Sequence, residues 1–167
     1  MPQTPRMLIR RAGIGDAAAV RRLTREAYAR WIPVIGREPK PMTADYEMAV
    51  QSHPIDLMYV GGALAALIEM IPAAGHLLVE NVAVLPAFQG QGIGRRLMAH
   101  AEAVATSLGY REITLYTNKL FAENVMLYTK LGYRVDREEA FSGGTVVHMS
   151  KPVGVRSRLV RPQRPGN

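Results

Sequence analysis

The strongest constraint on this fold is a glycine-rich turn, QGQGIGRR at residues 89–96, between an apolar and an amphipathic segment. The apolar segment, HLLVENVAV at 76–84, is typical of a strand, which Pro86 ends. From Ile93 onward, apolar residues recur every three or four positions, which predicts a helix that Gly109 ends. Two arginines therefore lie in the first turn of a helix, where the helix dipole disfavours cations. An anion bound at this turn would offset that cost.

The same pattern rules, applied to the rest of the chain, predict an α+β domain. We expect strands at 7–11, 57–60, 63–70, 76–84, 112–117, 133–141 and 145–150, and helices at 17–28, 43–52, 93–108 and 122–131. Asp16 and Thr43 are expected to cap the first two helices, and the proline-rich segment 31–42 is expected to be a loop. This order combines an antiparallel meander with one β-α-β crossover, so we expect a mixed, mostly antiparallel sheet of six to seven strands flanked by about four helices.

Composition excludes several classes of protein. The chain has 167 residues, of which 48% are hydrophobic, and no apolar run approaches the roughly 20 residues of a membrane span, which predicts one soluble domain without a membrane partner. The first residues, MPQTPRMLIRR, lack the apolar stretch of a signal peptide, so we expect a cytoplasmic protein. With no cysteine, a disulfide framework, a thiolate zinc site and a cysteine nucleophile are excluded. The four histidines lack metal-ligand spacing, so we expect no metal.

Charge is concentrated at the end of the chain. Residues 151–167 carry five basic residues and no acid, so most of the formal charge of +7 lies there. We therefore predict a folded domain at 1–150 and a basic, flexible tail at 151–167. The tail has no aromatic residue on which a base could stack, which favours a solubilising role over nucleic-acid binding.

Two familiar phosphate-binding motifs do not match the glycine-rich turn. A Walker A loop ends in Gly-Lys-Ser/Thr, but Gly94 is followed by two arginines. A dinucleotide fingerprint that starts at Gly90 needs glycine at position 95, which is arginine. The pattern Gln89-x-x-Gly92-x-Gly94, directly after VAVLPAF, instead resembles the GNAT superfamily of acyl-CoA-dependent N-acetyltransferases, and LYTKLGY at 127–133 supports the resemblance.

The resemblance implies that acetyl-CoA is the acyl donor. Backbone N–H groups of the turn would bind its pyrophosphate, Arg95 or Arg96 would pair with a phosphate, and the strand before the turn, which carries a bulge in this family, would hydrogen-bond the pantetheine arm. Asn124 lies one turn before Tyr128 and is a further contact, with Asn118 as its rival and helix capping as the alternative role for either. The implied donor-binding residues are Val82, Ala83, Val84, Gln89, Gly90, Gln91, Gly92, Ile93, Gly94, Arg95 and Asn124.

The resemblance also implies direct transfer of the acetyl group to an amine in a ternary complex. Tyr128, four residues before Gly132 in the family's Tyr-x-x-x-Gly-Phe/Tyr pattern, would be the general acid. By strand alternation, Glu80 shares a face with Val82 and Val84 and is the candidate general base, with Glu69 as the second candidate. The structural alternatives are that Tyr128 is a core tyrosine and that Glu80 and Glu69 are solvated or paired with arginines.

The acceptor is expected to contact the segment between the first two helices, where Trp31, Arg37, Glu38 and Tyr46 are the candidate contacts. An arginine there would suit an amine that also carries a carboxylate, such as an amino acid or a peptide end. The alternative to an enzyme is an acyl-CoA-binding module without catalysis. Family members form dimers, and the strands at 133–150 offer an edge at which two copies would pair.

Overall fold

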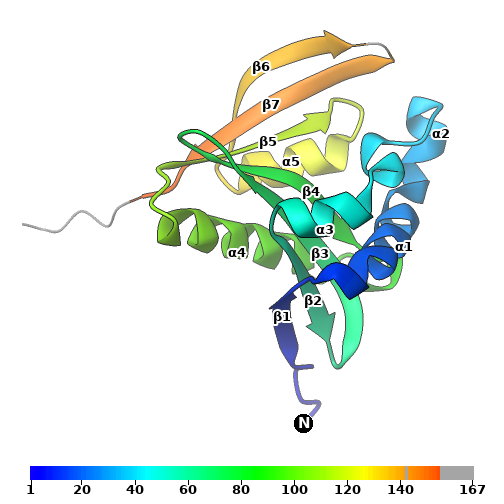
Figure 1. Ribbon diagram of the computed structural model, residues 1–167. Helices are drawn as coiled ribbons and strands as arrows, with labels where there is room; N and C mark the ends of the chain where they lie inside the picture. The colour runs from blue at the N-terminus through cyan, green and yellow to red at the C-terminus, as the bar shows by residue number, and fades with distance from the viewer. Residues whose placement is uncertain (142, 155–167) are drawn as a thin grey trace, which may run out of the picture.

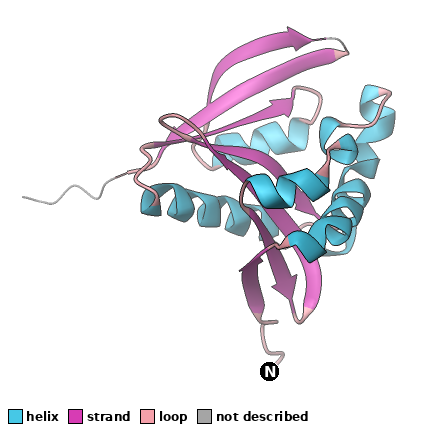
Figure 2. Cartoon of the chain, viewed as in Figure 1, coloured by secondary structure: helices cyan, strands magenta, loops and turns pink. Residues whose placement is uncertain are grey.

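A seven-stranded sheet with helices on both faces forms the protein in the computed structural model, which describes residues 1–141 and 143–154 (Figures 1 and 2). The order in the sheet is β1-β2-β3-β4-β5-β7-β6, and every neighbouring pair is antiparallel except β4 and β5. The expected α+β fold is confirmed. The strands are β1 (Met7–Arg11), β2 (Ile55–Val60), β3 (Ala63–Pro72), β4 (Leu77–Val84), β5 (Glu112–Asn118), β6 (Arg134–Phe141) and β7 (Gly144–Pro152).

The helices divide between the two faces of the sheet and bury separate apolar clusters. Helix α4 packs Leu97, Met98 and Ala101 against one face, where α5 adds Tyr128. On the other face α1 contributes Leu23. The helices are α1 (Ala17–Tyr28), α2 (Ile32–Ile35), α3 (Tyr46–Ser52), α4 (Ile93–Ser107) and α5 (Ala122–Lys130). Among the described residues, no helix has the length and hydropathy needed to cross a membrane.

Strands β4 and β5 pair only at their start. Their parallel register runs from Leu77–Ile113 to Val79–Leu115 and then stops. On the other side of β4, Asn81 pairs with Glu69 while Val79 pairs with Met70, which leaves Glu80 as an extra residue in a bulge. The strands therefore separate at the point where the bulge bends β4.

The bulge overturns one expectation from strand alternation. Val82 and Val84 pack with the apolar cluster beneath α4. Glu80 instead contacts Tyr116, whose neighbour Leu115 belongs to that same cluster, so Glu80 and Tyr116 lie on the opposite face. The predicted common face of Glu80, Val82 and Val84 is wrong, because one inserted residue reverses the alternation.

Three local predictions also need correction. The segment expected to be a loop contains α2, because Pro33 lies in its first turn, where a missing N–H costs nothing. Asp45 caps α3 by accepting a bond from the Met48 N–H at 3.0 Å, whereas Thr43 lies in a 3-10 turn. The carboxylate of Asp16 does not cap α1, because it accepts bonds from Arg10 and from the N–H of Gly13.

The folded unit continues beyond the predicted boundary at residue 150. Strand β7 extends to Pro152, which pairs with Glu112, and the buried Val153 donates its N–H to the Arg111 carbonyl at 2.9 Å. Residues 155–167, which hold most of the predicted tail, lie outside the described residues. Strand β6 lies at the edge of the sheet, and all of its residues are exposed. Pairing of two copies at this edge stays a prediction.

Candidate functional site

One cavity of about 440 Å³ lies between the glycine-rich turn, the end of β4, the end of α1 and one side of α5, and we call it the turn cavity. It brings together the predicted donor-binding residues with the exception of Gln91, whose side-chain amide donates to the Ala87 carbonyl at 3.4 Å. The residues of the predicted set that line it are Val82, Ala83, Val84, Gln89, Gly90, Gly92, Ile93, Gly94, Arg95 and Asn124.

The glycines leave the backbone of this turn open. Gly90 and Gly92 have φ of +77°, a conformation that side chains disfavour, and a Cβ at either would meet no atom within 4 Å. The first N–H groups of α4 have no partner within the helix, Gly92 gives them no side-chain cap, and the first turn has no acid. The dipole of this 15-residue helix thus adds to open donors at the cavity wall. Such a wall suits phosphate oxygens.

Arg30, which the sequence analysis missed, ties three elements together at this cavity. Its guanidinium donates to the Gln89 side-chain oxygen at 3.1 Å and forms an ion pair with Glu123 of α5. The Gln89 amide in turn donates to the Val84 carbonyl at 3.0 Å, so it cross-links the turn to the end of β4. The Trp31 ring stacks on the Phe121 ring, with their centroids 4.4 Å apart, and also contacts the Arg30 guanidinium. Trp31 borders the turn cavity rather than the second cavity, described next.

The second cavity, of about 520 Å³, lies between β4, β5, the α2 segment and the β6–β7 hairpin, and we call it the hairpin cavity. Glu80 and Arg37 line it, together with Lys40 and Tyr116. The residues that border both cavities are Tyr28, Val82, Asn124 and Tyr128. The two cavities therefore meet at the place where β4 separates from β5.

Tyr128 places a protonated hydroxyl at this meeting point. The side chain is 8% exposed, and burial raises its pKa to about 12. Its ring packs edge-to-face on Tyr133, at 6.0 Å between centroids. Within residues 1–141 and 143–154 the hydroxyl has no hydrogen-bond partner, so its proton is available to a molecule in the cavity.

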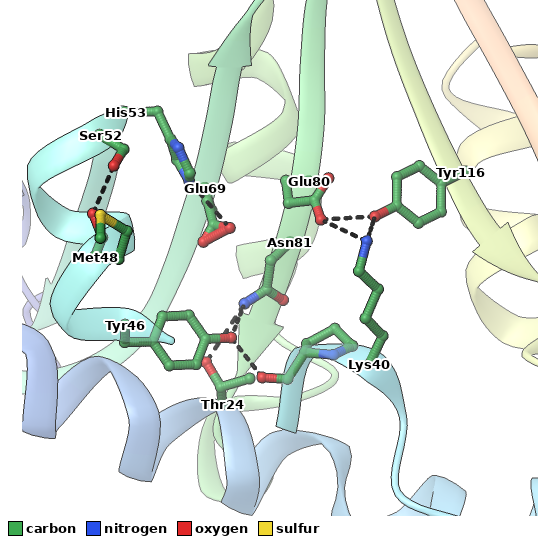
Figure 3. A network of polar contacts seen from close by, with 11 residues as sticks. Thr24, Lys40, Tyr46, Met48, Ser52, His53, Glu69, Glu80, Asn81 and Tyr116 are labelled. Carbon is green, nitrogen blue, oxygen red and sulfur yellow. Dashed lines mark hydrogen bonds and ion pairs between the residues drawn. The ribbon is translucent and has the colours of Figure 1, made fainter. Parts of the chain in front are cut away.

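Glu80 lies in a polar cluster on the face of the sheet that α1 and α3 cover (Figure 3). Its Oε1 accepts a bond from the Tyr116 hydroxyl at 2.6 Å and lies 3.5 Å from Nζ of Lys40. Burial, followed by the bond to Glu80, raises the pKa of Tyr116. Neither partner was predicted from the sequence, because they are 36 and 40 residues away in the chain and no local pattern links them.

A second network holds the bulge against α1. The Asn81 side-chain oxygen accepts a bond from the Tyr28 hydroxyl at 2.9 Å, and the same hydroxyl lies 3.2 Å from the Val82 carbonyl. The Asn81 amide nitrogen lies 3.4 Å from the side-chain oxygens of Thr24 and Tyr46 (Figure 3). These bonds position the β4 backbone beside the cavities.

Two candidates from the sequence lie away from both cavities. Tyr46, an expected substrate contact, is 1% exposed and donates its hydroxyl to the Pro41 carbonyl at 2.6 Å, so it anchors the segment after α2. Glu69 is buried, its Oε1 lies 3.3 Å from Nε2 of His53, and burial raises the pKa of Glu69. Neither residue borders the turn cavity or the hairpin cavity.

The two asparagine candidates differ in position. Asn124 borders both cavities, whereas Asn118 borders only the hairpin cavity and accepts the Leu120 N–H on its side-chain oxygen at 2.9 Å. Neither caps α5, which begins after Phe121 without a side-chain cap. Among the residues that the structure describes, no group of three or more histidines and acids is arranged to hold a metal.

Comparisons with known proteins agree with this geometry. A family model described as the acetyltransferase (GNAT) domain matches residues 55–135. N-alpha-acetyltransferase 80 of Mus musculus is 37% identical over 71 residues, which are 42% of this chain but only 21% of that protein, so the match spans about a fifth of the relative.

Solved structures match over nearly the whole fold. The PaiA N-acetyltransferase of Thermoplasma acidophilum, in complex with coenzyme A, has a TM-score of 0.74 and 18% identity and covers 88% of this chain and 99% of its own. The ribosomal-protein-S18-alanine N-acetyltransferase of Escherichia coli has a TM-score of 0.71 and 18% identity, and the match covers 93% of this chain and 99% of that protein. At these identities the likeness shows a shared fold.

Proposed function

Because a GNAT acetyltransferase domain model matches residues 55–135, we propose that the chain is a member of this family and that it transfers the acetyl group of acetyl-CoA to a primary amine by direct attack in a ternary complex. The observation that carries the proposal is the meeting of two cavities at Tyr128, one of them bordered by an open glycine turn and a helix N-terminus. A donor in the turn cavity and an acceptor in the hairpin cavity would then share this meeting point. The sequence-based expectation of a cytoplasmic protein stays part of the proposal.

The donor site uses backbone groups more than side chains. N–H groups of residues 90–95 bind the pyrophosphate, since that of Gln89 is donated to the Pro86 carbonyl, and Arg95, which borders the turn cavity, adds a charge-assisted contact. Beyond Val79 the β4 edge no longer pairs with β5, and we assign the backbone of Val82 and Val84 to hydrogen bonds with the pantetheine arm, such as an added strand would make. Solved relatives carry coenzyme A or, in an acetyltransferase from Salmonella typhimurium, acetyl-CoA.

Proton transfers are assigned to one residue on each side of the reacting bond. Glu80 Oε1 is engaged by Tyr116 and Lys40, and the carboxylate receives the proton that the attacking amine loses, directly or through water. As the C–S bond breaks, the Tyr128 hydroxyl donates a proton to the leaving thiolate. Its raised pKa keeps this hydroxyl protonated throughout the neutral range.

Arg37 is the residue that we assign to acceptor recognition. Its guanidinium carbon lies 5.2 Å from the Phe141 ring centroid, and its buried Nε has no hydrogen-bond partner among the described residues. The charges of Glu80 and Glu139 in the same cavity are engaged by Lys40 and by Arg137 and His148. The cation of Arg37 therefore favours an amine that also carries a carboxylate.

Calorimetric titration of acetyl-CoA into the protein and into Gly92→Glu tests the donor site. Tight binding that the added carboxylate abolishes supports the proposal, whereas no binding by the folded parent overturns it. Turnover is then followed by a thiol reagent that detects released CoA, and this assay has no protein background because the chain lacks cysteine. Binding without turnover of carboxylate-bearing, neutral or peptide amines would instead identify a non-catalytic acyl-CoA-binding module.

A further inference from the structure

Lys40 differs from the other lysines of the chain in its position. The chain has four lysines, Lys40, Lys119, Lys130 and Lys151. Lys40 borders the hairpin cavity, and the other three border neither cavity. Two of those three form ion pairs elsewhere, Lys119 with Glu138 and Lys151 with Glu102. An acetyl group presented at the junction of the cavities would therefore meet the amine of Lys40 before any other lysine.

The Lys40 amine already occupies a site suited to an ammonium group. Nζ lies 3.1 Å from the Tyr116 hydroxyl and 3.5 Å from Glu80 Oε1, and it lies 5.5 Å from the centroid of the Tyr116 ring (Figure 3). Carboxylate, hydroxyl and aromatic face are groups that bind an ammonium, and the carboxylate of Glu80 can also accept its proton. The side chain of Lys40 thus stands where we place the acceptor's amine.

The backbone around Lys40 is anchored, while its side chain is free to move. The Tyr46 hydroxyl binds the Pro41 carbonyl at 2.6 Å, and Arg25 binds the Met42 carbonyl at 3.0 Å. The Lys40 side chain is 73% exposed, and an ion pair whose ammonium is open to solvent holds that side chain only weakly. Leaving Glu80 for the Tyr128 end of the same cavity therefore costs little. A tethered amine also has an effective concentration on the order of millimolar, without any binding step.

We propose that Lys40 is a self-acetylation site, modified by the acetyl-CoA bound to the same chain when no acceptor fills the hairpin cavity. The proposal rests on the proposed function. The Lys40 ammonium gives one proton to Glu80, and the neutral Nζ attacks the thioester carbonyl. The C–N bond forms, the C–S bond breaks, the nitrogen releases its second proton to water, and the thiolate takes the Tyr128 proton, so that the products are an amide and CoA. Proton exchange with water restores Glu80 and Tyr128.

The experiment is incubation of the full chain with isotopically labelled acetyl-CoA in the absence of any amine acceptor. Intact mass counts the acetyl groups, and peptide mapping assigns them among the four lysines. We expect one labelled group, on Lys40, formed at a first-order rate that does not change with protein concentration. Lys40→Arg should abolish the mass increase, whereas the matched variant Lys119→Arg, which alters another exposed, ion-paired lysine, should leave it unchanged.

Catalysed and chemical acetylation are separated by Tyr128→Phe, which should slow labelling of Lys40 at least about 100-fold while leaving slow labelling of the other lysines as it was. Even labelling of all four lysines, a Lys40 rate proportional to protein concentration, or a rate that Tyr128→Phe does not change would overturn the inference. Acetyl-CoA titration and turnover of an added amine are measured on the same sample. Binding and turnover with unmodified Lys40 would refute self-acetylation alone, whereas absence of binding would refute the proposed function as well.

Discussion

Replacing Gly92 by alanine tests the donor site against a control that has the same backbone strain. Gly92 has φ of +77° at the turn cavity, and Gly109 has φ of +82° just beyond the far end of α4. A Cβ at either position meets no atom within 4 Å, so neither variant creates a clash. Gly92→Ala and Gly109→Ala therefore differ in one respect, which is whether the new methyl group faces the turn cavity.

The two variants should lose similar stability. A left-handed conformation costs a residue with a Cβ about 1–2 kcal/mol, and the lower entropy of the unfolded chain returns roughly 0.4–1 kcal/mol of that. The net loss is about 1 kcal/mol, which for a chain of this size lowers Tm by roughly 2–4 °C. Thermal unfolding of both variants measures this loss in the absence of ligand.

Coenzyme A affinity should then separate the variants. The methyl group at position 92 keeps phosphate oxygens from the backbone N–H groups, and each lost hydrogen bond to a charged group costs about 1.5–3 kcal/mol. One such loss weakens binding by roughly 10- to 150-fold, whereas Gly109→Ala should bind as the parent does. Calorimetric titration with coenzyme A measures this difference without any chemical step. Equal affinities of the two variants would refute the assignment of the turn as a phosphate cradle.

The remaining predictions concern the chemistry and the pH dependence. Tyr128→Phe should lower kcat about 10²- to 10⁴-fold with unchanged acetyl-CoA affinity, because it removes only the hydroxyl; steady-state kinetics that show an unaltered kcat would exclude this residue as the acid. Arg37→Met should lower kcat/KM roughly 10- to 100-fold for carboxylate-bearing amines and little for neutral amines of equal size, and similar losses for both would contradict its role. Burial raises the pKa of Tyr46 and of Tyr128 to about 12, above the unfolded value of about 10, so their contribution to stability is complete below pH 10 and is lost as pH rises through 12. The free energy of unfolding in urea should therefore fall above about pH 10, by up to roughly 2–3 kcal/mol for each tyrosine, and a flat profile would contradict these pKa shifts.

Parts of the candidate site that lie close together in the chain were predictable from the sequence. The segment from Val82 to Arg95 contains a strand end, Pro86 and three glycines, and each of these acts through local backbone geometry. Tyr128 followed from its spacing to Gly132, and that prediction rested on the family resemblance. The turn cavity could therefore be outlined before the structure was known.

Contacts between distant segments could not be predicted in this way. The cluster of Lys40, Glu80 and Tyr116 joins three elements, and Arg30 reaches Gln89 across 59 residues. Tyr46 has the polarity and position of a substrate contact, yet it is buried as an anchor. The hydrophobic periodicity of a sequence does not show whether a residue such as Tyr46 faces a cavity or is buried against a neighbouring segment.

By itself the sequence determined the order of strands and helices and the open turn at the N-terminus of α4, because periodicity, proline and glycine act within a few residues. Only the tertiary structure decided which groups accompany Glu80 and where the two cavities meet. The reason is the bulge at Glu80: one unpaired residue turns the carboxylate away from Val82 and toward Tyr116, and it coincides with the end of the pairing between β4 and β5. A change of register depends on the partner strand, which sequence alone does not specify.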